Sequence, residues 1–187
     1  GVTSRANIED LFQRFWFTAP MTQPFQLAAC AEMLWRDQPM GWRVRRLTEL
    51  GFGVGLWNWP DHDLNDLERS GAPFTIMNGY LQGRLADKDG ADMLLKSAQE
   101  TAQVGKRLGV ARLNLHGTGL GDFGLPIPQL ATFAPGMELR ARDTLHRICD
   151  MAEKEGVTFT LENLNPVDHP GCPFGSTAAV LSLVPSH

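Results

Sequence analysis

The chain has 187 residues, of which 43% are hydrophobic and 20% are charged, and its formal net charge is −4. This length and composition are typical of one globular domain with a single core. The negative charge argues against non-specific binding of nucleic acid, which depends on clustered Lys and Arg. Three widely spaced cysteines without a C-x-x-C pair argue against a disulfide framework and favour a reducing compartment. Since no apolar run reaches the roughly 18 residues of a membrane helix, we expect a cytoplasmic protein that binds neither nucleic acid nor membranes.

The regular pattern begins after residues 1–24, which we interpret as a leader of uncertain structure ahead of one domain over residues 25–187. Short runs of β-branched, aromatic or small apolar residues predict strands, and apolar residues at every third or fourth position predict helices. Strands are expected at residues 25–31, 54–57, 73–77, 110–115 and 157–161. Helices are expected at residues 41–50, 63–68, 90–108, 137–155 and 176–184. Strands and helices therefore alternate along the chain.

Three of the predicted helices end at a glycine just before the next strand, namely Gly51, Gly109 and Gly156. Glycine is favoured at a left-handed C-cap because it has no Cβ. Ser176 is the expected N-cap of the last helix. Repeated βα units with short turns predict a parallel sheet, since each crossover helix returns the chain to the same edge. The fold is therefore α/β, either a doubly wound sheet or a (β/α) barrel.

Polar and aromatic residues at the strand ends distinguish these two folds. Predicted strands end at or just before Trp57, Asn58, Asn78, His116, Glu162 and Asn163. In a (β/α) barrel the reactive groups gather at the carboxyl ends of the strands. A doubly wound nucleotide-binding protein needs instead a Gly-rich turn after its first strand, and this sequence has none there. We therefore predict a partial (β/α)8 TIM barrel with about five parallel strands and flanking helices.

Five sequence motifs, in order along the chain, resemble those of the hydroxypyruvate isomerase family, one of the xylose-isomerase-like TIM barrels. They lie at residues 31–35, 57–61, 76–84, 113–117 and 160–165, and the resemblance covers about residues 25–184. It implies aldose–ketose isomerisation of a small hydroxy-carbonyl compound, hydroxypyruvate to tartronate semialdehyde, with a divalent metal. Oxygen and imidazole ligands suit Mg²⁺ or Mn²⁺. The sequence departs from the family at Gly55, where a glutamate is usual, and in lacking the family's ligands on strands six to eight.

The expected site is built from one carboxylate and five further side chains. The resemblance implies that Glu162 is both the catalytic acid/base and a metal ligand. The residues expected to bind substrate are His116, Trp57, Asn78, Arg84 and Asn163. The guanidinium group of Arg84 suits a substrate carboxylate, and Trp57 offers an apolar wall. Each residue also has a structural interpretation, as a satisfied histidine, ordinary packing, a surface arginine or the cap of a turn.

Two further hypotheses compete with an active isomerase. Five strands leave two sheet edges to be covered, so the chain is expected to form a homo-oligomer that completes the barrel. In the first alternative such a partial barrel has no catalytic activity and acts as an oligomeric or binding protein. In the second, the chain is related to the abasic-site endonucleases, which share the fold. The acidic net charge counts against this second alternative.

Overall fold

The computed structural model describes residues 25–110, 112–127, 136–172 and 174–184, so the predicted leader lies outside the described residues. Five parallel strands form one sheet in the order β1-β2-β3-β4-β5. They are β1 (Ala28–Cys30), β2 (Gly53–Leu56), β3 (Phe74–Asn78), β4 (Arg112–Leu115) and β5 (Thr158–Leu161). Each strand pairs with the next one in the sequence, whereas a doubly wound sheet reverses its strand order. The predicted α/β fold, a partial (β/α) barrel, is confirmed.

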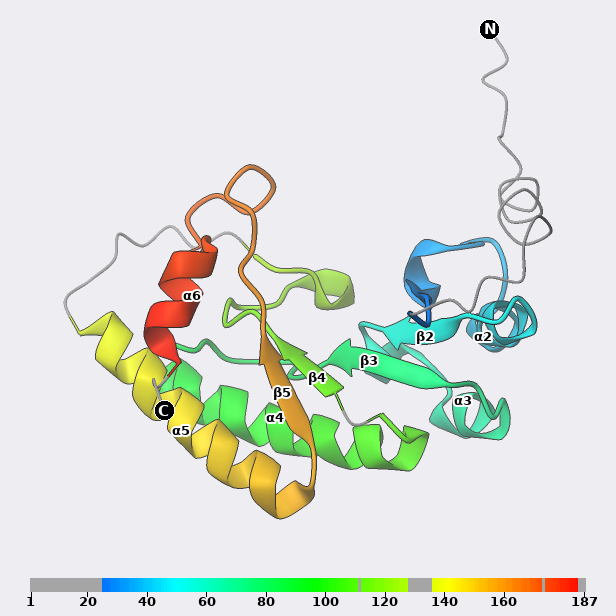
Figure 1. The fold of residues 1–187 in the computed structure, drawn as a ribbon, viewed down its shortest axis with the longest axis horizontal. Helices are drawn as coiled ribbons and strands as arrows, with labels where there is room; N and C mark the ends of the chain where they lie inside the picture. The colour runs from blue at the N-terminus through cyan, green and yellow to red at the C-terminus, as the bar shows by residue number, and fades with distance from the viewer. Residues whose placement is uncertain (1–24, 111, 128–135, 173, 185–187) are drawn as a thin grey trace, which may run out of the picture.

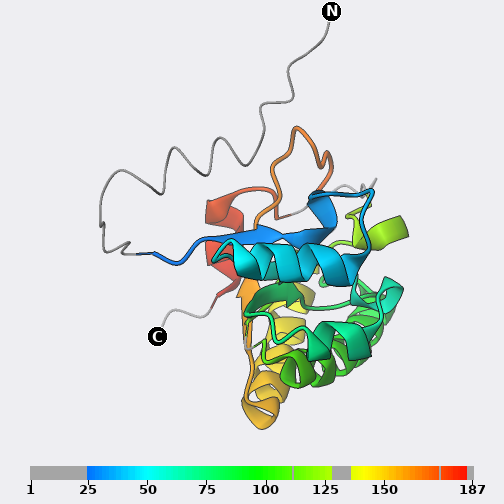
Figure 2. The ribbon, with the colours of Figure 1, turned by 90° about the vertical axis from the view of Figure 1, so that its right-hand side faces the viewer.

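The helices cover one face of this sheet. They are α2 (Met40–Glu49), α3 (Leu64–Arg69), α4 (Lys88–Leu108), α5 (Met137–Glu155) and α6 (Thr177–Leu183). Figure 1 shows α4 and α5 side by side along the sheet, with α6 beside α5. Figure 2 looks onto α2 and α3, which pack together next to β2. Among the described residues, no helix combines the length and the apolar character needed to cross a bilayer.

The helix ends follow the predicted chemistry. Gly109 and Gly156 end α4 and α5 in the left-handed conformation, with φ of 74° and 68°. The Ser176 side chain accepts a hydrogen bond from the backbone N–H of Ala179 at 3.2 Å, and so caps α6 as expected. Asp63 caps α3 in the same way, accepting from two backbone N–H groups.

The first strand is shorter than the predicted range of residues 25–31. It begins at Ala28 and ends at Cys30. Ala31–Met33 turn into the short 3₁₀ helix η1. The Glu32 carboxylate in this turn accepts hydrogen bonds from the backbone N–H groups of Trp57 and Asn58, beyond β2. The turn after the strand is thus bound to a distant loop, a contact that no local pattern in residues 25–31 could have shown.

Alternation along the strands separates a packed face from an open face. In β4, Leu113 and Leu115 are buried among residues of the hydrophobic core, whereas Asn114 between them is only half-buried. In β3, Met77 is buried but its neighbour Ile76 is 38% exposed. The helices therefore pack on the Leu113 side of the sheet, and the opposite side, which carries Asn114 and Ile76, is open toward the site.

Candidate active site

A pocket of about 380 Å³ lies at the carboxyl ends of the strands, a volume suited to a small organic molecule. Each of the five strands contributes a residue at or just beyond its end, namely Cys30, Trp57, Asn78, His116 and Glu162. Four of these were expected from the sequence to belong to the site. The parallel arrangement of the strands brings them together, since all the strands finish at the same edge of the sheet.

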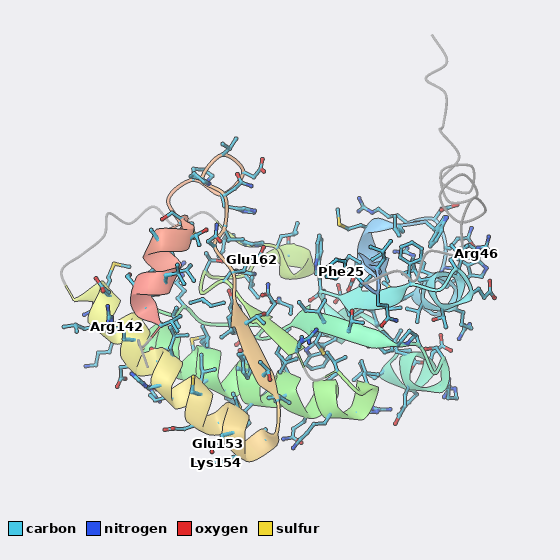
Figure 3. All side chains as sticks on the ribbon, in the orientation of Figure 1. Phe25, Arg46, Arg142, Glu153, Lys154 and Glu162 are labelled. Atoms are coloured by element: carbon cyan, nitrogen blue, oxygen red, sulfur yellow. The ribbon has the colours of Figure 1, made fainter. Side chains whose placement is uncertain are left out.

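The Glu162 carboxylate is held at the pocket by the neighbouring strand. Its backbone N–H donates to the Leu115 carbonyl oxygen at 2.7 Å, which continues the β4–β5 ladder by one residue. The Asn114 side-chain N–H donates to the Glu162 carboxylate, and the Asn114 oxygen accepts from the Thr160 hydroxyl at 2.9 Å. Figure 3 shows Glu162 at the carboxyl end of β5, far from Glu153 near the end of α5. The carboxylate is thus both accessible and oriented.

His116 forms the buried back wall of the pocket and is 6% exposed. Its Nδ1 lies 2.9 Å from the Tyr80 hydroxyl and 3.0 Å from the Thr118 hydroxyl. Burial, reinforced by the charge of His169, lowers the pKa of the imidazole from 6.5 to about 4. The ring is therefore neutral at physiological pH, when it can act as an acceptor as well as a donor.

Trp57 and Asn78 complete the predicted part of the lining. Asn78 is buried at the end of β3 and pairs in register with Asn114. The Trp57 ring is 37% exposed at the rim, where an indole can cover the apolar face of a small ligand. The pocket lining thus combines an indole with amide, imidazole and carboxylate groups.

Two of the predicted substrate-binding residues lie elsewhere. Arg84 does not line this pocket, and its guanidinium group pairs with Asp87 at 3.4 Å in the loop before α4. Asn163 follows Glu162 but is exposed, and its oxygen accepts from the Thr177 hydroxyl at 3.5 Å near the start of α6. The described lining therefore contains no arginine or lysine.

Glu32, which the sequence analysis left out of the site, bonds to two residues of the pocket lining, Cys30 and Trp57. Its carboxylate, with a side chain 15% exposed, accepts from the N–H groups of Trp57 and Asn58 at 2.9 and 3.0 Å and lies 3.2 Å from His62 Nε2. Burial raises the pKa of this carboxyl, but the bonds from His62, Asn58 and Trp57 outweigh burial and leave the pKa below 4.5. Glu32 thereby fixes the backbone that presents Trp57 to the pocket.

The Cys30 thiol donates to the other Glu32 oxygen at 3.3 Å. Burial, followed by the charge of Glu32, raises the pKa of this thiol to about 12. Cys30 is therefore a neutral thiol at the pocket floor and is not activated as a nucleophile, because the reactive form of cysteine is the thiolate.

We expect Glu32→Gln to lower the free energy of unfolding by about 1–3 kcal/mol near neutral pH, because it weakens several partly buried bonds to a charged acceptor. A carboxyl with a depressed folded pKa stabilises the fold above its unfolded pKa, and this stabilisation is lost as the pH falls through the folded value. The difference between the variant and the wild type should therefore shrink below pH 4.5. Urea unfolding over a pH series measures this difference.

Glu138→Gln is the control, because it alters an exposed pair with Arg142. It should change the free energy of unfolding by about 0.5 kcal/mol or less. Equal losses for both variants would contradict the role of Glu32.

His169 and Asn114 were also absent from the predicted site. His169 lies in the loop after β5 and lines the pocket, half-buried. No local signal indicated this position. For Asn114 a signal existed, because a single carboxamide between Leu113 and Leu115 must face away from the packed side of the strand.

A metal site is not completed by the described residues. No three side chains among the described His, Cys, Asp and Glu residues are grouped closely enough to hold a metal ion. Glu162 supplies a carboxylate of the type that Mg²⁺ or Mn²⁺ prefers, but the described part of the pocket does not surround it with further ligands. The predicted metal therefore stays a prediction.

The chain is similar to several solved structures, but the comparisons of its sequence with family models and curated proteins find no match. An AP endonuclease of family 2 from Brucella melitensis matches with a TM-score of 0.65 and 18% identity over 84% of this chain and 64% of that protein. An IolI protein with a bound zinc atom matches with a TM-score of 0.65 and 16% identity over 86% of this chain and 58% of the other. A D-psicose 3-epimerase, solved in the presence of D-fructose, matches with a TM-score of 0.60 and 15% identity, over 85% and 60% of the two chains.

These neighbours are xylose-isomerase-like TIM-barrel proteins, and at such low identity they establish the fold alone. The chain spans about three fifths of the length of the solved structures that it matches. The general resemblance inferred from the sequence motifs is therefore confirmed at the level of the barrel type, whereas the specific likeness to hydroxypyruvate isomerase belongs to the proposal below.

Proposed function

We propose that the pocket belongs to a sugar-type isomerase or epimerase that moves a proton on a small hydroxy-carbonyl compound. The observation that carries this proposal is the position of Glu162, an accessible carboxylate oriented by Asn114 in a pocket that also contains His116. A general base must lie within hydrogen-bond reach of the C–H bond that it breaks. A ligand that fills this pocket meets Glu162 in that way.

The proposed step is an exchange of hydrogen between neighbouring carbons. Glu162 takes the C–H hydrogen of the hydroxyl-bearing carbon as a proton, and an enediolate forms from the electron pair left behind. Glu162 then returns the proton to the former carbonyl carbon, while the hydroxyl proton passes to the former carbonyl oxygen. An epimerase would instead return a proton to the same carbon from the opposite face, which requires a second proton carrier.

Within this class, the finer proposal is conversion of hydroxypyruvate to tartronate semialdehyde with Mg²⁺ or Mn²⁺. The sequence motifs support it, whereas the position of Arg84, paired with Asp87 outside the pocket, removes the expected partner of the substrate carboxylate. An uncharged ketose does not need that partner. Hydroxypyruvate and D-fructose are therefore the two substrates to compare.

The test measures proton abstraction directly. The full chain is incubated in D₂O with each substrate, with and without saturating Mn²⁺ or Mg²⁺, and mass spectrometry records deuterium entering carbon-bound positions. Label in hydroxypyruvate supports the finer proposal, and label in D-fructose alone supports an enzyme of uncharged sugars. Neither label nor isomerised product from either substrate would overturn the enzymatic proposal and favour the inactive barrel. Cleavage of duplex DNA at an abasic site would favour the endonuclease alternative instead. Light scattering on the same sample tests the predicted homo-oligomer.

A further inference from the structure

Behind the pocket, three buried residues form a small hydrogen-bonded cluster that the proposed step does not use. Tyr80, which is fully buried, lies two residues beyond the end of β3. His116 and Thr118 follow β4 and are 6% and 2% exposed. The rings of Tyr80 and His116 meet edge to face, with centroids 5.3 Å apart. The cluster therefore joins the loops that follow two neighbouring strands.

The position of the Tyr80 hydrogen follows from its contact with the Thr118 backbone. The Tyr80 hydroxyl oxygen lies 2.5 Å from the Thr118 carbonyl oxygen. A carbonyl oxygen has no hydrogen, and two oxygens approach this closely only with a proton between them. Tyr80 therefore donates to Thr118, and since a phenol has a single hydrogen, its oxygen faces His116 as an acceptor.

This assignment fixes the proton on the imidazole. The Tyr80 oxygen lies 2.9 Å from His116 Nδ1, so Nδ1 must carry the hydrogen of that bond. The Thr118 hydroxyl oxygen, 3.0 Å from Nδ1, is a second acceptor within reach of the same hydrogen. Burial opposes a charge on the ring, and in a neutral imidazole only one nitrogen is protonated. Nε2 is therefore left with a lone pair.

The Nε2 atom has no hydrogen-bond partner among the described residues. Since no fully buried side-chain nitrogen or oxygen of the described residues lacks a partner, Nε2 keeps some accessible surface. His116 is part of the pocket lining, so the pocket is the space from which a ligand can reach this atom.

We propose that Tyr80 is a positioning residue which, together with Thr118, holds His116 as the Nδ1–H tautomer, so that Nε2 accepts a hydrogen bond from a substrate hydroxyl group. This inference rests on the proposed function, in which the hydroxyl group on the carbon that loses its hydrogen must also give up its proton as it becomes a carbonyl. A lone pair binds that O–H group, whereas an N–H group at the same position would bind the carbonyl oxygen instead. Tyr80 thus determines which oxygen of the substrate His116 recognises.

The test is a long-range ¹H–¹⁵N correlation spectrum of the full chain labelled with ¹⁵N-histidine, at near-neutral pH and without substrate. The His116 signals are assigned by their loss in His116→Gln, and His146 on the exposed face of α5 is the internal reference. We expect an unprotonated Nε2 and a protonated Nδ1 for His116 in the wild type. A proton on Nε2, or protons on both nitrogens, would overturn the inference without any need for a variant.

Two variants test the cause of this tautomer. Tyr80→Phe should lower the Nδ1–H population, and Tyr80→Phe with Thr118→Val should transfer the proton to Nε2, because both acceptors are lost. Thr144→Val is the control, since its hydroxyl bonds only within α5, and it should leave the spectrum of His116 unchanged. Retention of the wild-type pattern in the double variant would show that Tyr80 and Thr118 do not set the tautomer.

The spectrum requires no turnover, so the two proposals can fail separately. An inactive chain with the proton on Nδ1 of His116 would contradict only the proposed function. An active chain with the proton on Nε2 would contradict only this inference.

Discussion

Glu162→Gln should abolish most of the proton transfer, with a fall of about 10²–10⁴-fold in the rate of deuterium incorporation, the usual contribution of a general acid or base. The glutamine side chain keeps the shape of glutamate and an oxygen that can accept from Asn114. It cannot take a proton from carbon. The loss should therefore appear in the rate, while the thermal unfolding temperature stays close to that of the wild type.

Glu153→Gln is the matched control, since Glu153 is exposed near the end of α5, at the opposite end of the sheet from Glu162. It removes the same charge and should retain full activity. If wild type and Glu162→Gln exchange deuterium at equal rates, the carboxylate does not carry the reaction, and another group in the pocket must be sought. A large fall in the unfolding temperature of Glu162→Gln would instead assign it a structural role.

Gly83→Ala should be the most destabilising of the small substitutions, with a loss of about 3 kcal/mol or more in the free energy of unfolding. Gly83 has φ of 93°, and a Cβ there would lie 2.2 Å from the Leu94 backbone nitrogen and 2.3 Å from the Gly90 carbonyl oxygen. The left-handed conformation alone costs about 1–2 kcal/mol for a residue with a Cβ, and overpacking typically adds about 1–3 kcal/mol. For a chain of this size the unfolding temperature should fall by at least about 6–12 °C.

Gly71→Ala separates the two causes. Gly71 also has a positive φ, 62°, but a Cβ there would meet nothing within 4 Å. This variant should lose only the conformational part, so calorimetry should place it clearly above Gly83→Ala. Equal unfolding temperatures would show that the loop between β3 and α4 yields to the added methyl group. The comparison bears on the site, because this loop contains Tyr80 and is tied to the loop after β4 by the bond from Leu85 N–H to the Gly117 carbonyl.

Much of the fold was predictable because its signals are local. The bounds of α5, at Met137 and Glu155, match the expected residues, since Gly156 stops the helix and the apolar period is regular. The turn that follows β1 was not predictable, because its residue Glu32 is bound to a loop that lies far along the sequence. Local sequence thus indicates where helices stop, whereas this turn is held by tertiary hydrogen bonds.

The residues of the site also fall into those that the local sequence indicates and those that depend on the tertiary structure. Trp57, Asn78, His116 and Glu162 were predictable because parallel strands must end at one edge of the sheet. The partner of Glu162 depends instead on the register of β4 against β5, which places Asn114 opposite Thr160. Arg84 was placed in the site because it follows β3, but its loop turns back to pair with Asp87. Side chains on loops need the tertiary structure, and side chains at strand ends do not.

The uninterrupted strand order has a consequence for how the protein acquires its structure. Every strand hydrogen-bonds to the one that precedes it in the chain, so no pairing has to wait for a distant segment. Each parallel pairing still requires a complete βα crossover, which makes parallel sheets slow to form compared with local contacts, but N-terminal units can form first during synthesis. As the chain leaves the ribosome, each new strand can therefore pair with a strand that was synthesised before it.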